Sequence, residues 1–197
     1  MKSGVTLRPT TEPKLMIQNV KKITHLLIAF TCLAASAQAG WKKDLSEQLP
    51  LLGHRNWVVV ADSAYPLQTA PGIETVYVGG DHVAVVREVL ELVAQQKHVR
   101  PVIFTDAELE HVAEAHAPGI EAVRDELQSL LKGSGAQTLG HEAIIEQLDE
   151  AGESFKVVII KTDLALPYTS VFIRLDCGYW SAEAEAVLRD SMRSDKE

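Results

Sequence analysis

Histidine, aspartate and tyrosine side chains that could transfer protons or bind hydroxyl groups stand beside apolar runs of this chain. His54 precedes the run Trp57–Ala61, and Asp62 follows it directly. His141 opens a helical pattern after a glycine, and Tyr168 follows a proline ahead of a later apolar run. An imidazole titrates near neutral pH, so it can both accept and donate a proton. Each histidine taken singly is also consistent with a surface or capping residue, and none alone defines a site.

The spacing of His54 and Asp62 separates the two side chains. Five extended residues span roughly 17 Å at about 3.3 Å per residue, so one straight strand holds them at opposite ends. We therefore expect the two to meet only if the chain bends or if a neighbouring subunit supplies one of them.

The elements that position these residues alternate between strand and helix patterns. Strands are predicted at residues 57–61, 74–78, 101–104, 155–160 and 170–175, and helices at residues 81–97, 105–116, 120–131 and 141–150. Thr105 and Glu108 have the spacing of a capping box that opens the second helix, and Ala151–Gly152 is expected to end the fourth. The alternation predicts one three-layer α/β domain with a mostly parallel central sheet.

The first 39 residues have the pattern of a secretory signal. Lys21 and Lys22 precede a short apolar run over residues 23–33, and Ala37–Gln38–Ala39 has the small residues of a cleavage site. Cleavage before Gly40 would place the protein in the periplasm or outside the cell, with an uncleaved membrane anchor as the alternative. The folded domain is expected over residues 40–180, followed by a polar tail over residues 181–197.

The amino-acid composition and the net charge exclude several classes of protein. The chain has 197 residues, of which 46% are hydrophobic, and a formal net charge of −8. This composition is that of a folded protein rather than a disordered one. The acidic balance argues against nucleic-acid or anionic-membrane partners, which select for Lys and Arg. If residues 1–39 are removed, Cys177 is the one cysteine left and is expected to be a packing thiol.

Metal and nucleotide motifs are incomplete in this sequence. His141–Glu142 begins like the zinc-protease pattern, but Ile145 stands where the second histidine is required. Neither a phosphate-binding glycine loop nor a nucleophile elbow is present. A metal-binding exported protein that uses His54, His141 and nearby carboxylates stays open as a minor alternative.

Read together, these positions resemble the D-ribose pyranase and L-fucose mutarotase family. That family opens with Leu/Met-Gly-His, a hydrophobic strand and an Asp-x-x-x-Pro-like turn. Later it has a histidine ahead of its penultimate strand and a Pro-Tyr-x-Asn before its final strand. The matching residues here are Leu52–Gly53–His54, Val58–Val59–Val60, Asp62, Pro66, His141–Glu142, Pro167–Tyr168–Thr169–Ser170 and Val171–Phe172–Ile173. The similarity covers about residues 45 to 179.

The resemblance implies interconversion of ring forms or anomers of a free monosaccharide, without metal, nucleotide or redox cofactor. It assigns His54 as the general acid/base and Asp62 as the group that orients it or holds a sugar hydroxyl. His141, Tyr168 and Ser170 would contact the sugar. Family members form closed rings with sites at subunit boundaries, so a homo-oligomer is implied here.

The chain departs from the family pattern in ways that keep a second function open. Ser170 stands where the family has an asparagine, and Thr162–Asp163 replaces a Gly-Glu. Serine loses the amide donor and acceptor of asparagine. The chain also looks exported, whereas family members are cytoplasmic. The alternative is therefore a non-catalytic exported sugar-binding or assembly protein on the same fold.

Overall fold

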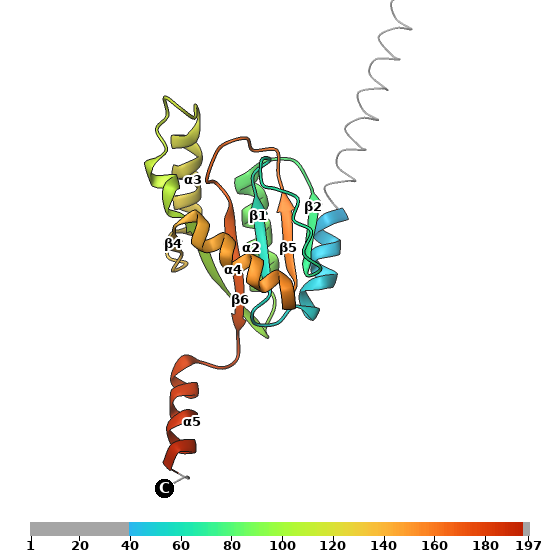
Figure 1. Cartoon of the computed structure of the whole chain (residues 1–197), viewed down its shortest axis with the longest axis vertical. Coiled ribbons are helices and arrows are strands. Elements are labelled where there is room, and N and C mark those ends of the chain that lie inside the picture. The colour runs from blue at the N-terminus through green and yellow to red at the C-terminus, as the bar shows by residue number, and fades with distance from the viewer. Residues whose placement is uncertain (1–39, 195–197) are drawn as a thin grey trace, which may run out of the picture. The chain divides into compact units, whose positions relative to one another are not determined.

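A six-stranded sheet lies at the centre of residues 40–194, the part of the chain that the computed structural model describes (Figure 1). Its strands are β1 (Trp57–Ala61), β2 (Ile73–Tyr77), β3 (Val99–Asp106), β4 (Gln137–Leu139), β5 (Val157–Lys161) and β6 (Val171–Cys177). They lie in the order β2-β5-β1-β6-β3-β4. Only β6 runs antiparallel to its neighbours, since the other paired strands of the described chain are parallel. The predicted α/β domain with a mostly parallel sheet is thus confirmed.

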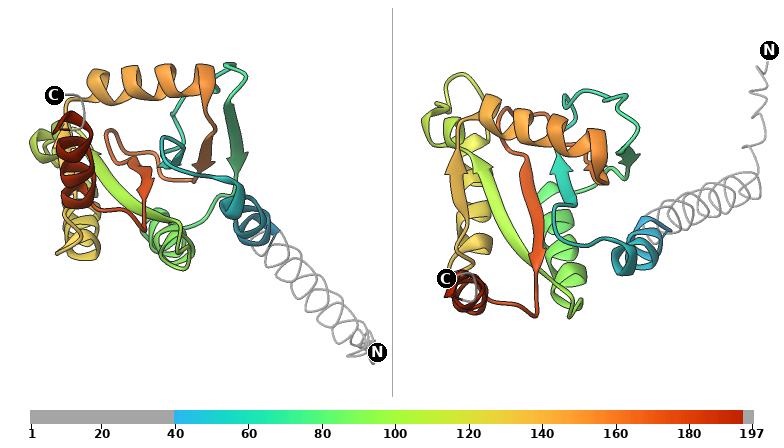
Figure 2. Two further views of the ribbon diagram at one scale, coloured as in Figure 1. Left: turned by 90° about the horizontal axis from the view of Figure 1, so that it is seen from below. Right: turned by 60° about the horizontal axis from the view of Figure 1, so that its bottom comes forward.

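Helices cover both faces of this sheet. Figure 2 shows α4 (His141–Ser154) on one face and α2 (His82–Ala94) on the other. The α2 face also carries α3 (Ile120–Leu131) and the one-turn helix η1 (Leu49–Leu51). The last helix, α5 (Ala182–Ser194), follows β6 as an exposed element. The described residues all belong to one compact unit, Gly40–Glu197.

The strand β1 is buried along its whole length because both sheet faces are covered. Val58 and Val60 pack into the core on the α2 and α3 side, whereas Trp57, Val59 and Ala61 pack into the core beneath α4. A strand covered on both faces requires a continuous apolar run instead of an alternating one. The β-branched run at residues 57–61 meets this requirement, and the predicted strand has the observed bounds.

The sheet topology brings several polar residues to one edge. The carboxyl ends of β1, β3, β4 and β5 lie at the same edge, together with the amino end of β6, because β6 alone is reversed. Ligands of open α/β sheets bind at this edge. Asp62, Asp106 and Ser170 are placed there by their strands, and His141 is placed there by the turn from β4 into α4.

The helix predicted from the Thr105–Glu108 capping box is wrong. Thr105 and Asp106 continue β3 and pair with β4, and residues 107–111 form the short 3-10 helix η2 (Ala107–His111). The backbone of β3 finds hydrogen-bond partners in β4, and these make the local cap unnecessary. Glu108 instead acts on another element, as described below.

The predicted break at Ala151–Gly152 is also wrong, because α4 continues to Ser154. A Cβ atom on Gly152 would lie 2.6 Å from the Cγ1 atom of Ile73. The glycine therefore allows α4 to pack closely against the segment that enters β2, and it does not end the helix.

The predicted secretory signal and its cleavage after Ala39 lie outside the described residues. Within residues 40–194, no helix is both long enough and apolar enough to cross a membrane.

Candidate functional site

A cavity of about 300 Å³ opens at the carboxyl edge of the sheet. It lies between the loop after β1, the loop between β5 and β6, and the first turns of α4. Its lining residues are Asp62, Ala64, Tyr65, Pro66, Gln68, His141, Glu142, Ile145, Pro167 and Tyr168. The volume is that of a small-molecule site, with apolar walls and a few polar groups that can fix a ligand's orientation. Of the predicted site residues, Asp62, His141 and Tyr168 meet here.

The carboxylate of Asp62 is held in place by its own loop and by the start of β6. Its Oδ1 atom accepts the backbone N–H of Ala64 at 2.8 Å, and its Oδ2 atom accepts the hydroxyl of Ser170 at 3.0 Å. The backbone N–H of Asp62 in turn donates to the Ser170 Oγ atom at 3.3 Å. Ser170 is 2% exposed, so its hydroxyl supports Asp62 and does not itself line the cavity.

His141 is held by two carboxylates from other elements, one at its backbone and one at its ring. Its backbone N–H, at the start of α4, donates to both carboxylate oxygens of Glu108 in η2, at 3.1 and 3.0 Å. Glu108 thus caps a helix more than thirty residues away, and these hydrogen bonds lower its pKa. The ring Nδ1 atom of His141 lies 3.1 Å from Oδ1 of Asp106 at the end of β3.

The Asp106 carboxylate lies behind His141 and is 1% exposed. Its Oδ2 atom has no hydrogen-bond partner among the described residues. Burial raises the pKa of the Asp106 carboxyl above its ordinary range, although the hydrogen bond with His141 acts in the opposite direction. Asp106 and His141 therefore form a hydrogen-bonded pair at the wall of the cavity.

Tyr168 lies against the same histidine. The rings of Tyr168 and His141 meet edge to face, with centroids 5.5 Å apart and planes at 81°. Tyr168 has a φ of 60°, which is the left-handed region that non-glycine residues rarely adopt. Backbone strain of this kind is concentrated at functional sites, where surrounding contacts hold it in place.

Tyr65 and Gln68 complete the polar part of the cavity wall. The Tyr65 hydroxyl donates to Gln68 Oε1 at 3.1 Å, and the Gln68 amide donates to Asp149 at 2.6 Å. Burial, followed by the nearby acidic side chains, raises the pKa of the Tyr65 phenol. The phenol is thus a neutral hydroxyl group at physiological pH.

The buried ring of His82 stabilises the loop that carries Tyr168. Its Nε2 atom lies 2.8 Å from the carbonyl oxygen of Thr169, and its Nδ1 atom lies 2.9 Å from the Thr162 hydroxyl. The Thr169 carbonyl oxygen only accepts, so Nε2 carries the proton of the neutral ring, and Nδ1 lies beside the Thr162 hydroxyl, which donates to the Ala61 carbonyl at 3.1 Å. Burial lowers the pKa of His82, which favours this neutral form.

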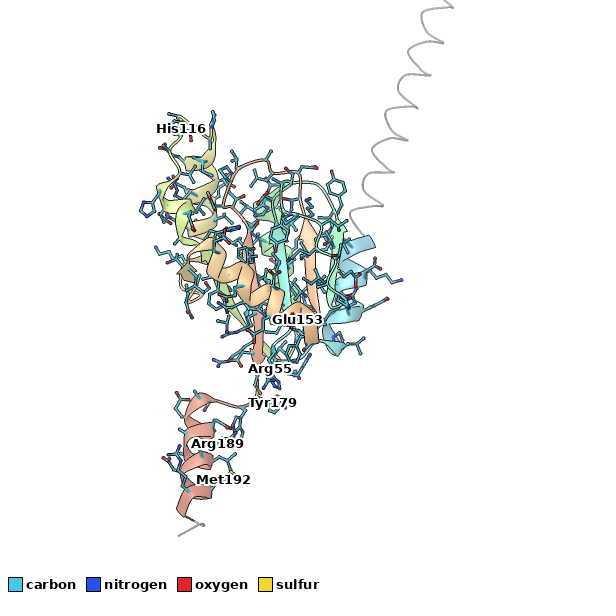
Figure 3. All side chains as sticks on the ribbon, in the orientation of Figure 1. Arg55, His116, Glu153, Tyr179, Arg189 and Met192 are labelled. Carbon is cyan, nitrogen blue, oxygen red and sulfur yellow. The ribbon has the colours of Figure 1, made fainter. Side chains whose placement is uncertain are left out.

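His54 lies at the other end of β1, as the spacing predicts for one chain. It is exposed in the turn Gly53–Asn56, which is closed by the bond from the Asn56 N–H to the Gly53 carbonyl at 3.2 Å. A second cavity, of about 330 Å³, lies at this end next to Arg55 and is also lined by Arg174, Glu150 and Glu153. Figure 3 shows Arg55 and Glu153 together at this end of the domain.

Sequence reasoning missed Asp106, His82 and Tyr65. Asp106 follows an apolar run and one polar residue, Thr105, and its position at a strand end is the one signal that could have identified it. His82 opens a helix after Asp81, which is an ordinary capping position. No three His, Cys, Asp or Glu side chains in residues 40–194 are arranged to hold a metal ion.

These features define an α/β protein with a small-molecule site at the edge of a largely parallel sheet. The model of the RbsD / FucU transport protein family matches residues 39–177, and the chain belongs to this family. Sequence comparison with curated proteins gives no match.

Among solved structures, the chain is similar to RbsD of Bacillus subtilis complexed with D-ribose, with 16% identity and a TM-score of 0.48. It is also similar to the fucose mutarotase of Streptococcus pneumoniae in complex with L-fucose, with 17% identity and a TM-score of 0.45. Each similarity covers 68% of this chain and 91% of the other.

Proposed function

We propose that this protein interconverts ring forms or anomers of a free monosaccharide in the cavity at the carboxyl edge of its sheet. The observation that carries this proposal is the convergence of Asp62, His141 and Tyr168 on one small cavity. Membership of the RbsD / FucU family supports a sugar as the ligand. The reaction needs only proton transfer, which an imidazole supplies near neutral pH.

The charges of the cavity favour an uncharged sugar. Its lining residues include the carboxylates of Asp62 and Glu142, and no lysine or arginine is among these described residues. A phosphate or carboxylate on the sugar would meet these negative charges without a compensating cation. Hydroxyl groups instead donate hydrogen bonds to carboxylates, and the apolar lining of Ile145 and Pro167 suits the C–H face of a sugar ring.

A second copy of the chain is part of this proposal. His54, the proposed general acid/base, stands at the opposite end of β1 from Asp62, so it does not reach the cavity of its own chain. A homo-oligomer in which the His54 turn of one copy packs against the cavity of the next would complete the site. In that arrangement Asp62 and Tyr168 hold sugar hydroxyls while the histidines transfer protons.

Export is a separate part of the proposal. We expect residues 1–39 to direct secretion and to be removed before Gly40. Mass spectrometry of the protein recovered from the periplasm or medium should give a chain that begins at Gly40. Recovery of the whole chain from the cytoplasm would contradict this part and leave the reaction untouched.

The reaction is tested by NMR magnetisation transfer between ring forms of ribose, fucose, galactose and glucose. The proteins compared are the unit Gly40–Glu197, its His141→Gln variant and the control His116→Gln, whose exposed side chain is not part of the cavity lining. We expect faster exchange of at least one sugar with the wild type and the control, and a loss of about 10²-fold or more in His141→Gln. No acceleration of any sugar by folded wild type would contradict the proposal.

A non-catalytic sugar-binding protein is the second candidate. Ser170 favours it, because its buried hydroxyl is bonded to Asp62 and offers nothing to a ligand where the family has an asparagine. Calorimetric titration with the same four sugars separates the two functions. Binding without exchange would support the second candidate and overturn the first.

A further inference from the structure

The buried carboxylate of Asp106 has a single side-chain partner. Its Oδ1 atom lies 3.1 Å from His141 Nδ1, while its Oδ2 atom has no hydrogen-bond partner within the described chain. Buried polar atoms without partners are uncommon in folded proteins and call for a reason. An apolar residue would pack at this position at a lower energetic cost than a buried carboxylate. The burial of Asp106 therefore points to an effect of its carboxylate on His141.

The position of this pair is set by the backbone on both sides. Asp106 is the last residue of β3 and pairs with Leu139 of β4, two residues before His141. Glu108 then binds the His141 backbone N–H from η2. One carboxylate thus fixes the start of the helix and the other fixes the ring.

The hydrogen bond determines which ring nitrogen carries the proton. An ionised carboxylate only accepts hydrogen bonds, so Nδ1 of His141 must be the protonated nitrogen that donates to Asp106. In the neutral imidazole this leaves the lone pair on Nε2. Because His141 lines the cavity and Asp106 lies behind it, Nε2 is the ring nitrogen left to accept a proton from a ligand.

Charged and phenolic groups face this pair from every element around it. They are Glu108 from η2, Asp62 and Tyr65 from the loop after β1, Glu142 from α4 itself and Tyr168 from the loop between β5 and β6. The charged members are all acidic, so an imidazolium formed at His141 would be surrounded by compensating charge.

We propose that Asp106 is a positioning residue that holds His141 in the Nδ1–H tautomer, and that Nε2 of His141 accepts the proton of the anomeric hydroxyl. This inference rests on the proposed function. The anomeric O–H gives its proton to Nε2, its bonding pair becomes the second bond of the new carbonyl, and the ring C–O bond breaks. The ring oxygen keeps that electron pair and takes a proton from the general acid, assigned above to His54. Ring closure reverses these transfers.

The tautomer is tested without any sugar. Long-range proton–nitrogen NMR on nitrogen-15-labelled Gly40–Glu197 distinguishes Nδ1–H from Nε2–H, and the His141 signals are those lost in His141→Gln. We expect Nδ1–H for neutral His141 in the wild type. In Asp106→Asn the amide can donate to Nδ1, so the Nε2–H tautomer should take over. Nε2–H in the wild type would overturn the proposal even if Asp106→Asn does not fold.

The matched control is Glu108→Gln, which changes the carboxylate at the His141 backbone but keeps the one at its ring. We expect the Nδ1–H tautomer to remain in this variant. If both variants change the tautomer alike, or neither does, the hydrogen bond to Asp106 does not specifically set the tautomer and the proposal is wrong.

Kinetics then separate positioning from a merely structural role. With a sugar that the wild type exchanges, Asp106→Asn should slow exchange by about 10²-fold or more, while calorimetric affinity for that sugar stays within about threefold. Unaltered exchange in folded Asp106→Asn would overturn the role of Asp106 alone. A wild type that has the Nδ1–H tautomer and exchanges no sugar would overturn the proposed function and leave the tautomer assignment standing.

Discussion

The two ends of β1 carry polar groups in opposite situations. At the carboxyl end, Asp62 and the nearby His141 are held by hydrogen bonds from residues of other elements. At the amino end, the guanidinium groups of Arg55 and Arg174 form no hydrogen bond or ion pair within residues 40–194, and each lies over aromatic rings. One end is preorganised within the chain, and the other presents the exposed Arg55 and the half-buried Arg174 together with His54.

This difference indicates how the functional residues of a site are distributed between the two ends of β1. Groups that must keep one geometry are positioned at strand ends and helix starts, where several elements supply hydrogen bonds. His54 lies on a turn with a left-handed residue, Arg55, whose φ is 76°. The backbone N–H of Arg55 is bonded to the Leu175 carbonyl at 3.0 Å, so the turn itself is anchored while the side chains of His54 and Arg55 are exposed. Such a turn is suited to contribute to a site that another copy completes.

The largest expected effect comes from His54, which lies farthest from the cavity of its own chain. His54→Ala should slow sugar exchange by about 10²- to 10⁴-fold, the range of general acid–base catalysis. Because the side chain is exposed, the free energy of unfolding should change by less than about 0.5 kcal/mol. Magnetisation transfer and denaturant unfolding measure the two quantities. Full activity in His54→Ala would show that the two ends do not act together.

The buried His82 gives the next effect, which concerns stability at the carboxyl end. Burial lowers its pKa below the ordinary 6.5, so the stability that the neutral ring confers is present above pH 6.5. That stability is lost as the pH falls from 6.5 through the lowered pKa, with a slope of at most about 1.4 kcal/mol per pH unit. Urea unfolding between pH 7.5 and 5 should show this slope, and His82→Gln should reduce it.

The matched control for His82 is His98→Gln. His98 is half-buried near the amino end of β1, where its Nε2 atom lies 2.9 Å from the Leu52 carbonyl oxygen. Equal slopes in the wild type and in His82→Gln would contradict the assignment of the acid-side loss to His82.

The hydrogen bonds at Asp62 predict a smaller loss. Ser170→Ala leaves the Asp62 N–H and its Oδ2 atom without the serine hydroxyl, which should lower the free energy of unfolding by about 1 kcal/mol. Exchange should also slow, because Asp62 is then less well oriented. Ser134→Ala is the control, since its hydroxyl bonds the Leu131 carbonyl at 2.7 Å outside the cavity lining. Slower exchange in the control as well would argue against a specific role for Ser170.

Arg174 should give the smallest effect, because its charge has no carboxylate bound to it. Its guanidinium carbon lies 5.4 Å from the Phe104 ring centroid and 6.0 Å from that of Trp57. Arg174→Gln should therefore lower the free energy of unfolding by about 0.5–1 kcal/mol, as measured by thermal or urea unfolding. If Arg174→Gln lowers the free energy of unfolding more than Ser170→Ala does, the amino end of β1 contributes more to stability than the carboxyl end, which would contradict this ranking.

The sequence predicts well those features that depend on local patterns. The apolar run 57–61 predicts β1 with its observed bounds, because a strand covered on both faces has a simple signature. The same strand length predicts that His54 and Asp62 are far apart within one chain. Asp62, His141 and Tyr168 were identified from strand and helix boundaries, and the structure brings these three together at one cavity.

Features that depend on pairing between distant residues could not be predicted. Glu108 has the local spacing of a capping box with Thr105, but it caps α4 because β3 extends past Thr105 to pair with β4. Strand β4 has three residues and no apolar alternation, so neither the strand nor its pairing has a sequence signature. Without β4, the approach of Asp106 to His141 cannot be inferred from the chain.

The central claim, that the two ends of β1 meet between copies, is tested most directly by mixing two inactive variants. His54→Ala and His141→Gln, each expected to lose exchange alone, are co-expressed from Gly40 with different tags and purified through both tags. In a mixed oligomer with sites shared by two copies, the exchange rate should recover to about a quarter to a half of the wild-type rate, depending on the number of copies, since that share of sites has both wild-type residues. If the mixed oligomer is as inactive as each variant alone, His54 and His141 do not work together across copies and the account is contradicted.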